Sequence, residues 1–383
     1  MTPSPDIARR SLEGAGDLLD RIRTAREADA PDDDDAAPWI AAFTGYANDR
    51  VATVHARVLR TPPPRVPSEH DGRWRNLRDT IRRFRTDEVA HARVRITVGH
   101  ASVEAAADED GHVAADVPLS GPSDALGGWA NARVSLLSPR RREPARVARV
   151  RLLVPSAAAA FGVVSDLDDT VIRSDVTRPL RMVLTLALRN AHTRLPFEGV
   201  AAFYRALRDG TNAPNPLFYV SSSPWNLYDL LADFLRLQEI PHGPLLLRDW
   251  GVAGGGIPLA HGSHKRAAIN RIMDRYPSLP FILIGDSGQE DPEIYASVLH
   301  DHPGRILAVY IRDVTKSRER SKAIGRLARE ARRAGGTLML VPDTLAAARH
   351  AADRGWIDAA RLGEIASERD ADHGDRAAAT VRR

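Results

Sequence analysis

Residues 161–172 read FGVVSDLDDTVI, an apolar run that leads into three aspartates within four positions. Aspartate is common in turns because its side chain bonds nearby backbone amides, so a simple turn is one interpretation of this cluster. The other interpretation is chemical. Asp166 and Asp168 lie on one side of an extended backbone, where a divalent cation would hold the two carboxylates together. The rest of the chain decides between a turn and a metal site.

Short apolar runs continue from Ala157 onward, separated by stretches with helical periodicity. The helical stretch at 224–238 reads PWNLYDLLADFLRLQ, with Ser223 as its expected N-cap and Pro224 in its first turn. Strands that alternate with helices predict an α/β fold, a doubly wound parallel sheet with helices on both faces. The apolar runs are FGVVS, LFYVS, PLLLR, PFILIG, RILAVYI and TLMLV.

The preceding part of the chain, from Trp39 to about Pro155, has a β pattern. WIAAFTGY and VATVHARVLR flank the turn ANDR, and the turn DEDG at 108–111 predicts a second hairpin. Several short strands with turns between them predict a smaller β-sandwich-like domain. Nothing here clusters nucleophiles, bases or metal ligands, which favours a binding or scaffolding role.

These patterns divide the chain into four predicted segments. The accessory β-rich domain is 39–156, and the α/β domain is 157–345 with a small cap at 171–215. An N-terminal helix with an acidic linker precedes them at 1–38, and a C-terminal helix with a polar tail follows at 346–383. The tail after Arg361 is expected to fray.

Composition narrows the possible functions. The 383 residues are 43% apolar and 27% charged, which suits a globular chain of about two domains. The sequence has no cysteine, so disulfides, a thiolate nucleophile and thiolate zinc sites are excluded. The net charge of +4 favours anionic partners. The first residues have no apolar signal core and no run is long enough to span a bilayer, so we expect a cytoplasmic protein.

Polar side chains follow three of the predicted strands at the point where each strand ends. DLDDT follows FGVVS, and the serines that include Ser221 and Ser222 follow LFYV. GDSGQED, with Asp286 and Asp291, follows FILI. Ligands of open α/β sheets bind at the carboxyl ends of the strands, so we expect these groups to meet at one rim.

The chemistry that suits this set is phosphoryl transfer. A carboxylate can attack phosphorus and so divide one difficult hydrolysis into two easier steps. Mg²⁺ prefers one or two carboxylates, with water and substrate phosphate completing its ligands. Lys265 is the best candidate for a stabilising cation, because its predicted helix leads directly into FILIGDSGQED.

The order DLDDT, YVS, Lys265 and GDSGQED resembles the haloacid dehalogenase phosphatase superfamily. More narrowly, it resembles the catalytic domain of the actin-patch-protein type of phosphatidate phosphatase. The resemblance covers roughly residues 39–345. The segments that carry it are GYANDRVATVHARVLR, VSDLDDTVIRSDVT, YVSSSPWNLYDLL, GPLLLRDWG, HKRAAINRI and FILIGDSGQEDPEIY.

The resemblance implies roles for three catalytic residues. Asp166 is implied to be the nucleophile and a Mg²⁺ ligand. Asp168 is implied to protonate the leaving alcohol, then to activate water, and to bind Mg²⁺ through its carbonyl. Lys265 is implied to steady both Asp166 and the phosphate.

The remaining site residues carry binding roles by the same resemblance. Thr170 supports the loop, and Ser221 and Ser222 hold the phosphoryl group. Asp286 completes the metal shell, while Asp291 either binds the metal or orients the lysine. Phosphatidate hydrolysis to diacylglycerol is the implied reaction. Hydrolysis of a small soluble phosphate ester and a non-catalytic phosphatidate-binding module stay open as alternatives.

Two segments bear on the choice of partner. PLRMVLTLALRN at 179–190 is apolar nearly all round, as suits either a core-packed cap helix or an interfacial segment. KSRERSKAIGRLAREARR at 316–333 is strongly basic, as suits either a solvated helix face or peripheral contact with an anionic membrane. Aromatics make up only 5% of the chain and do not alternate with basic residues, so no nucleic-acid partner is expected.

Overall fold

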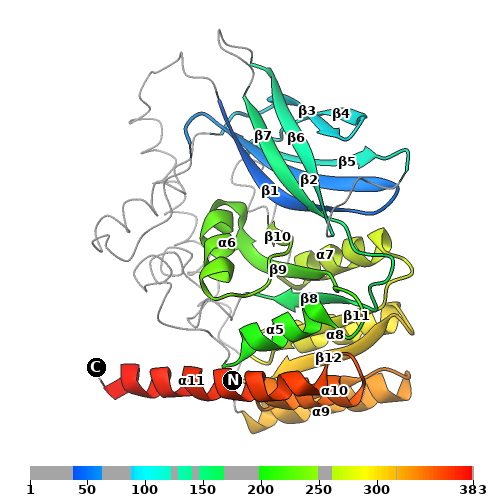
Figure 1. Ribbon diagram of the computed structural model, residues 1–383, viewed down its shortest axis with the longest axis vertical. Helices are drawn as coiled ribbons and strands as arrows, with labels where there is room; N and C mark the ends of the chain where they lie inside the picture. Colours follow the sequence, from blue (N-terminus) through cyan, green and yellow to red (C-terminus); the bar gives the residue numbers. More distant parts are fainter. Residues whose placement is uncertain are drawn as a thin grey trace, which may run out of the picture.

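The computed structural model describes residues 38–62, 88–121, 128–139, 146–167, 198–248, 261–315 and 317–381. For residues 261–263 and 373–381 the structure describes the backbone only. The predicted N-terminal helix, the segment 179–190, Asp168 and Thr170 lie outside these residues. Figure 1 shows two sheets, the first (blue to teal) above the second.

The first sheet is mixed and has seven strands in the order β4-β3-β6-β7-β1-β2-β5. Only β1 and β7 pair in parallel, and the two edge strands β4 and β5 contact each other. The sheet therefore curls into a nearly closed structure, here called the barrel. Its strands are β1 Trp39–Ala47, β2 Val51–Leu59, β3 Arg93–Val98, β4 Ala101–Ala106, β5 His112–Pro118, β6 Trp129–Ser138 and β7 Val147–Leu153.

The pairing confirms one predicted hairpin and contradicts the other. β1 and β2 are antiparallel neighbours across the turn ANDR. The turn DEDG, in contrast, joins β4 to β5, which pairs with β2. The hairpin partner of β4 is β3, across Gly99 and His100. Sequence alternation shows that these segments are strands, but pairing between distant strands decides the sheet.

The second sheet has six parallel strands in the order β10-β9-β8-β11-β12-β13. The strands are β8 Gly162–Asp166, β9 Leu217–Pro224, β10 Leu245–Arg248, β11 Phe281–Asp286, β12 Ile306–Arg312 and β13 Leu338–Val341. The helical elements of the described chain are α5 Val200–Asp209, η1 Trp225–Leu227, α6 Tyr228–Leu237, α7 His261–Arg275, α8 Asp291–Asp301, α9 Arg318–Arg333, α10 Thr344–Asp353, η2 Ala359–Arg361 and α11 Leu362–Val381.

Strand β8 lies at the centre of the parallel sheet, and all five of its residues are buried. Val163 belongs to the apolar cluster that includes α5, α6 and α10, and Val164 to the one that includes α7, α8 and α9. Gly162 is required by a close approach, since an added Cβ would lie 2.4 Å from the ring of Phe281. Burial of both faces explains why FGVVS is apolar throughout.

The fold class predicted from the sequence is wrong. It was a doubly wound, haloacid dehalogenase-like sheet preceded by a smaller β-sandwich-like domain. The structure instead has a mixed, nearly closed seven-stranded barrel and a separate six-stranded parallel sheet. Each strand has the same alternating pattern whether its buried face contacts a second sheet or the inside of its own curled sheet. The sequence pattern could not separate these cases.

Two local predictions also fail. Pro224 ends strand β9, and α6 starts only at Tyr228 after the short helix η1, so Ser223 is not its N-cap. The polar tail after Arg361 is helix α11, which packs on α5. Glu368 accepts a hydrogen bond from the backbone N–H of Ala202 at 2.8 Å, in the first turn of α5.

Strand β2 of the barrel packs against the parallel sheet, and both of its faces are buried. Val54 and its alternate neighbours face the barrel core. His55 and Arg57 point the other way and contact the residues that follow β9. The barrel is thus packed directly against the part of the parallel sheet that the sequence motifs single out.

Candidate active site

The three strand ends that carry the polar motifs are neighbours in the sheet. Strand β8 lies between β9 and β11, with Asp166 in register with Val220 and Ser165 in register with Ile284. Because the strands are parallel, Ser221 and Asp286 end up at the same edge as Asp166. The strand register therefore brings the three motifs to one edge of the sheet, as predicted.

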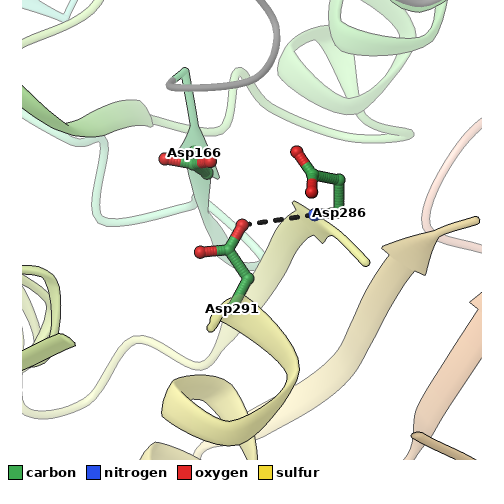
Figure 2. A group of neighbouring side chains, drawn as sticks. All are labelled: Asp166, Asp286 and Asp291. Atoms are coloured by element: carbon green, nitrogen blue, oxygen red, sulfur yellow. Dashed lines mark hydrogen bonds between the residues drawn. The ribbon is translucent and has the colours of Figure 1, made fainter. Parts of the chain in front are cut away.

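Three buried carboxylates meet at this edge (Figure 2). One oxygen from each of Asp166, Asp286 and Asp291 lies within 4.8 Å of the others. Asp291 opens helix α8, and its Oδ2 accepts a hydrogen bond from the backbone N–H of Asp286 at 3.2 Å. Gly285 allows this approach, because an added Cβ would lie 2.6 Å from Asp291 Oδ2.

Lys265 of helix α7 provides a buried cation beside these carboxylates. Its Nζ lies 2.8 Å from Asp166 Oδ1 and 3.0 Å from Asp291 Oδ1, and only 2% of its side chain is exposed. Gln289 Oε1 is at 3.5 Å. Three carboxylates and one ammonium leave an excess of two negative charges, and burying such an excess is costly. A divalent cation would balance it, so the donor set fits Mg²⁺.

The loop between β11 and α8 is fixed by its own bonds and by helix α9. Gly288 N–H donates to Asp286 Oδ1 at 2.6 Å. Arg320 donates to the carbonyl of Ser287 at 3.0 Å and to that of Gln289, and it pairs with Glu293. These contacts hold the backbone that carries Asp286 and Asp291. A rigid loop keeps the carboxylates in place before any ligand arrives.

The hydroxyl groups at the end of β9 lie on the strand next to Asp166. Ser221 is fully buried, and its Oγ accepts a hydrogen bond from the Ser223 N–H at 3.0 Å. Ser222 is partly exposed. Within β8 itself, Ser165 Oγ and the Tyr204 hydroxyl of α5 are 2.6 Å apart. Burial raises the pKa of Tyr204, so its hydroxyl stays protonated and neutral near Asp166.

Comparison with known proteins shows what the part of the chain that carries this site resembles. Residues 161–313 match the model of the catalytic domain of phosphatidate phosphatase APP1. The chain is similar to that catalytic domain over these residues, which are here called the APP1-type domain. This region contains Asp166, Lys265, Asp286 and Asp291, so the buried cluster is part of the APP1-type domain.

Two yeast proteins are similar to the APP1-type domain of this chain. Phosphatidate phosphatase APP1 of Saccharomyces cerevisiae is 32% identical over 158 residues, which is 41% of this chain and 26% of that protein. An uncharacterized protein of Schizosaccharomyces pombe is 31% identical over 155 residues, 40% of this chain and 25% of that protein. The similarity thus spans about a quarter of the length of each relative.

Among solved structures, a carbohydrate acetylesterase from Xanthomonas citri aligns over 78% of this chain and 75% of its own, with 12% identity and a TM-score of 0.26. This likeness is too low to carry an argument. In the part of the chain that the structure describes, no helix combines the length and the apolar character needed to cross a bilayer.

Within the APP1-type domain, four predicted site residues come together: Asp166, Lys265, Asp286 and Asp291. Ser221 and Ser222 lie on the adjacent strand end, whereas Asp168 and Thr170 are outside the described residues. Sequence reasoning missed Gln289, although it lies within GDSGQED.

It also missed Arg320, whose only sequence signal was membership of a basic run. Its role depends on the carbonyl groups that it contacts, which no local pattern specifies.

Proposed function

We propose that this protein is a Mg²⁺-dependent phosphatidate phosphatase, which hydrolyses phosphatidate to diacylglycerol and phosphate through an aspartyl-phosphate. The observation that carries the proposal is the buried ammonium of Lys265, within 3.0 Å of both Asp166 and Asp291. A carboxylate nucleophile has to approach an anionic phosphate, so it needs positive charge beside it. The match to the APP1 catalytic domain supports the lipid substrate.

The reaction proceeds in two steps. In the first, an oxygen of Asp166 bonds to phosphorus, the bond from phosphorus to the glycerol oxygen breaks, and Asp168 gives that oxygen a proton. In the second, Asp168 takes a proton from water, whose oxygen attacks phosphorus and releases phosphate from Asp166. General acid–base help of this kind is worth about 10²- to 10⁴-fold in rate.

Asp166, Asp286 and Asp291 would hold Mg²⁺, together with Asp168. When bound, the metal supplies positive charge that offsets repulsion between the nucleophile and the phosphate. The Lys265 ammonium attracts the Asp166 carboxylate and keeps one of its oxygens fixed by the 2.8 Å contact. Ser221, Ser222 and Thr170 are proposed to donate hydrogen bonds to the phosphoryl oxygens.

The test uses phosphatidate in mixed micelles beside a water-soluble aryl phosphate, sugar phosphates and nucleotide monophosphates. Asp166→Asn should abolish Mg²⁺-dependent phosphate release, while the exposed Asp274→Asn on α7 should keep it. If Asp166→Asn retained activity, the proposal that Asp166 is the nucleophile would be wrong. Preference for a soluble ester would refute the lipid substrate alone, and vesicle binding without any phosphate release would favour a binding module.

We also infer peripheral contact with an anionic membrane through α9. Five exposed basic side chains, three or four residues apart, lie along the solvent side of this helix, opposite buried Ile324. In the described part of the chain none of the five forms an ion pair, so they can attract anionic headgroups. They are Arg318, Lys322, Arg326, Arg329 and Arg333.

The membrane contact is tested by sedimentation with zwitterionic vesicles, with and without phosphatidate. Arg326→Glu with Arg329→Glu should release the protein from phosphatidate vesicles and leave turnover of the aryl phosphate unchanged. Equal binding of this variant and the parent would contradict the membrane contact.

A further inference from the structure

The segment that follows the β9 serines, residues 225–228, is held by the barrel and is here called the anchor segment. The Trp225 ring stacks on Phe43 of β1 at 4.7 Å, on His55 of β2 at 5.2 Å and on His112 of β5 at 5.1 Å between centroids. The three strands thus enclose one indole, which is only 7% exposed. Aromatic pairs with such geometry stabilise a contact beyond the area they bury.

Two polar contacts fix the rest of the anchor segment. Arg57 of β2 donates from Nη1 to Asn226 Oδ1 at 2.9 Å, while its Nη2 pairs with Glu88 at 2.8 Å. Thr44 N–H donates to the Tyr228 hydroxyl at 2.8 Å. Three residues of the anchor segment are therefore held by contacts from strands β1, β2 and β5, which limits both sliding and rotation.

His55 serves this contact as a planar apolar ring. Within the described residues, neither of its ring nitrogens has a hydrogen-bond partner. Burial lowers its pKa to about 3, so the ring is neutral at physiological pH. A neutral imidazole without polar partners contributes by stacking, and phenylalanine could therefore replace it.

The anchor segment is joined to the serines by a short, constrained connection. Ser221 Oγ accepts from the N–H of Ser223, and Pro224 follows with its φ restricted by the ring. A shift of Trp225 would therefore pass along the chain to the serine hydroxyls.

We propose that Arg57, His55 and His112 of the barrel are positioning residues that set the place of Ser221 and Ser222 by holding the anchor segment. The inference rests on the proposed function, because the serines act there as phosphoryl ligands. It gives the barrel a role in substrate binding without any barrel residue touching the substrate.

The first experiment compares kinetics on the aryl phosphate. Arg57→Met should raise KM about tenfold, since a hydrogen bond from a charged group is worth about that factor. The matched control is Arg95→Met, an exposed arginine of the same barrel that also pairs with a glutamate. Asn226→Leu removes the same contact and keeps the Arg57–Glu88 pair, so it covers the case in which Arg57→Met folds poorly.

The double variant decides whether these effects act through one contact. If Arg57 acts through Asn226, the double variant Arg57→Met with Asn226→Leu should raise KM no more than whichever single variant raises it more. His55→Ala should raise KM and His55→Phe should restore it. Unchanged KM in all folded variants, or full additivity in the double variant, would overturn the proposal.

A second measurement does not depend on catalysis. Amide hydrogen exchange of a peptide covering 217–228 should be faster in Arg57→Met than in the parent, and unchanged in Arg95→Met. Faster exchange with no phosphatase activity in the parent would support positioning of this strand end and refute the proposed function. Unchanged exchange would overturn the positioning role whatever the activity.

Discussion

Burial of His55 predicts a specific loss of stability in acid. The ordinary pKa is 6.5 and burial lowers it to about 3, helped by the nearby His112 and Arg271 and opposed by Asp116. At a pH below 6.5, His55 takes up a proton in the unfolded chain but stays neutral in the folded chain. The free energy of unfolding therefore falls as the pH falls, from the ordinary pKa down to the folded one.

The magnitude follows from these two values. Far below pH 6.5 the slope is about 1.4 kcal/mol per pH unit, and between pH 7 and pH 5 the loss from this one group is about 2 kcal/mol. Other groups titrate in the same range, so the informative quantity is the difference between two proteins. His55→Phe should lose about 2 kcal/mol less than the parent over this interval.

Urea unfolding followed by circular dichroism at a series of pH values measures this difference. Any constant cost of fitting the larger phenylalanine cancels, because it is the same at each pH. His100→Phe, in the exposed turn between β3 and β4, is the control for loss of one imidazole. The reasoning would be refuted if the parent and His55→Phe showed the same pH dependence within about 0.5 kcal/mol.

Three further predictions concern the site and its supports. Lys265→Met should destabilise the fold by about 3 to 5 kcal/mol in EDTA, because it leaves buried carboxylates unbalanced, and Mg²⁺ should restore part of the loss in a thermal melt. Gly285→Ala should displace Asp291, so Mg²⁺ should raise the melting temperature of this variant less than that of the parent. Glu368→Ala removes the acceptor for Ala202 N–H and should cost about 1 kcal/mol in urea unfolding with kcat unchanged.

The sequence predicted which polar residues meet at one sheet edge better than it predicted the fold. Parallel strands bring their carboxyl ends to one edge, so recognising FGVVS, LFYV and FILI as strands was enough to bring Asp166 and Asp286 together. Lys265 followed from its position in the helix before FILI. These predictions needed only local patterns and one general property of sheets.

What the sequence did not predict depends on contacts between distant residues. β5 pairs with β2 rather than β4, and this choice closes the barrel. Trp225 lies in the short helix η1, but no sequence pattern indicated that three strands from the other sheet enclose its ring. Arg320 supports the loop after β11 through carbonyl groups that every residue has. No periodicity distinguishes such partners in advance.

The packing of β1 and β2 against the anchor segment has a consequence for synthesis of the chain. Thr44 and Tyr228 are 184 residues apart in sequence. At about 5 to 20 residues per second, the ribosome needs roughly 10 to 40 s between them. During this interval the nascent barrel presents its outward β1 and β2 rings to the cell without their indole partner. Chaperones that bind exposed apolar surface would meet the chain at this stage, and slower translation before residue 225 would lengthen their access.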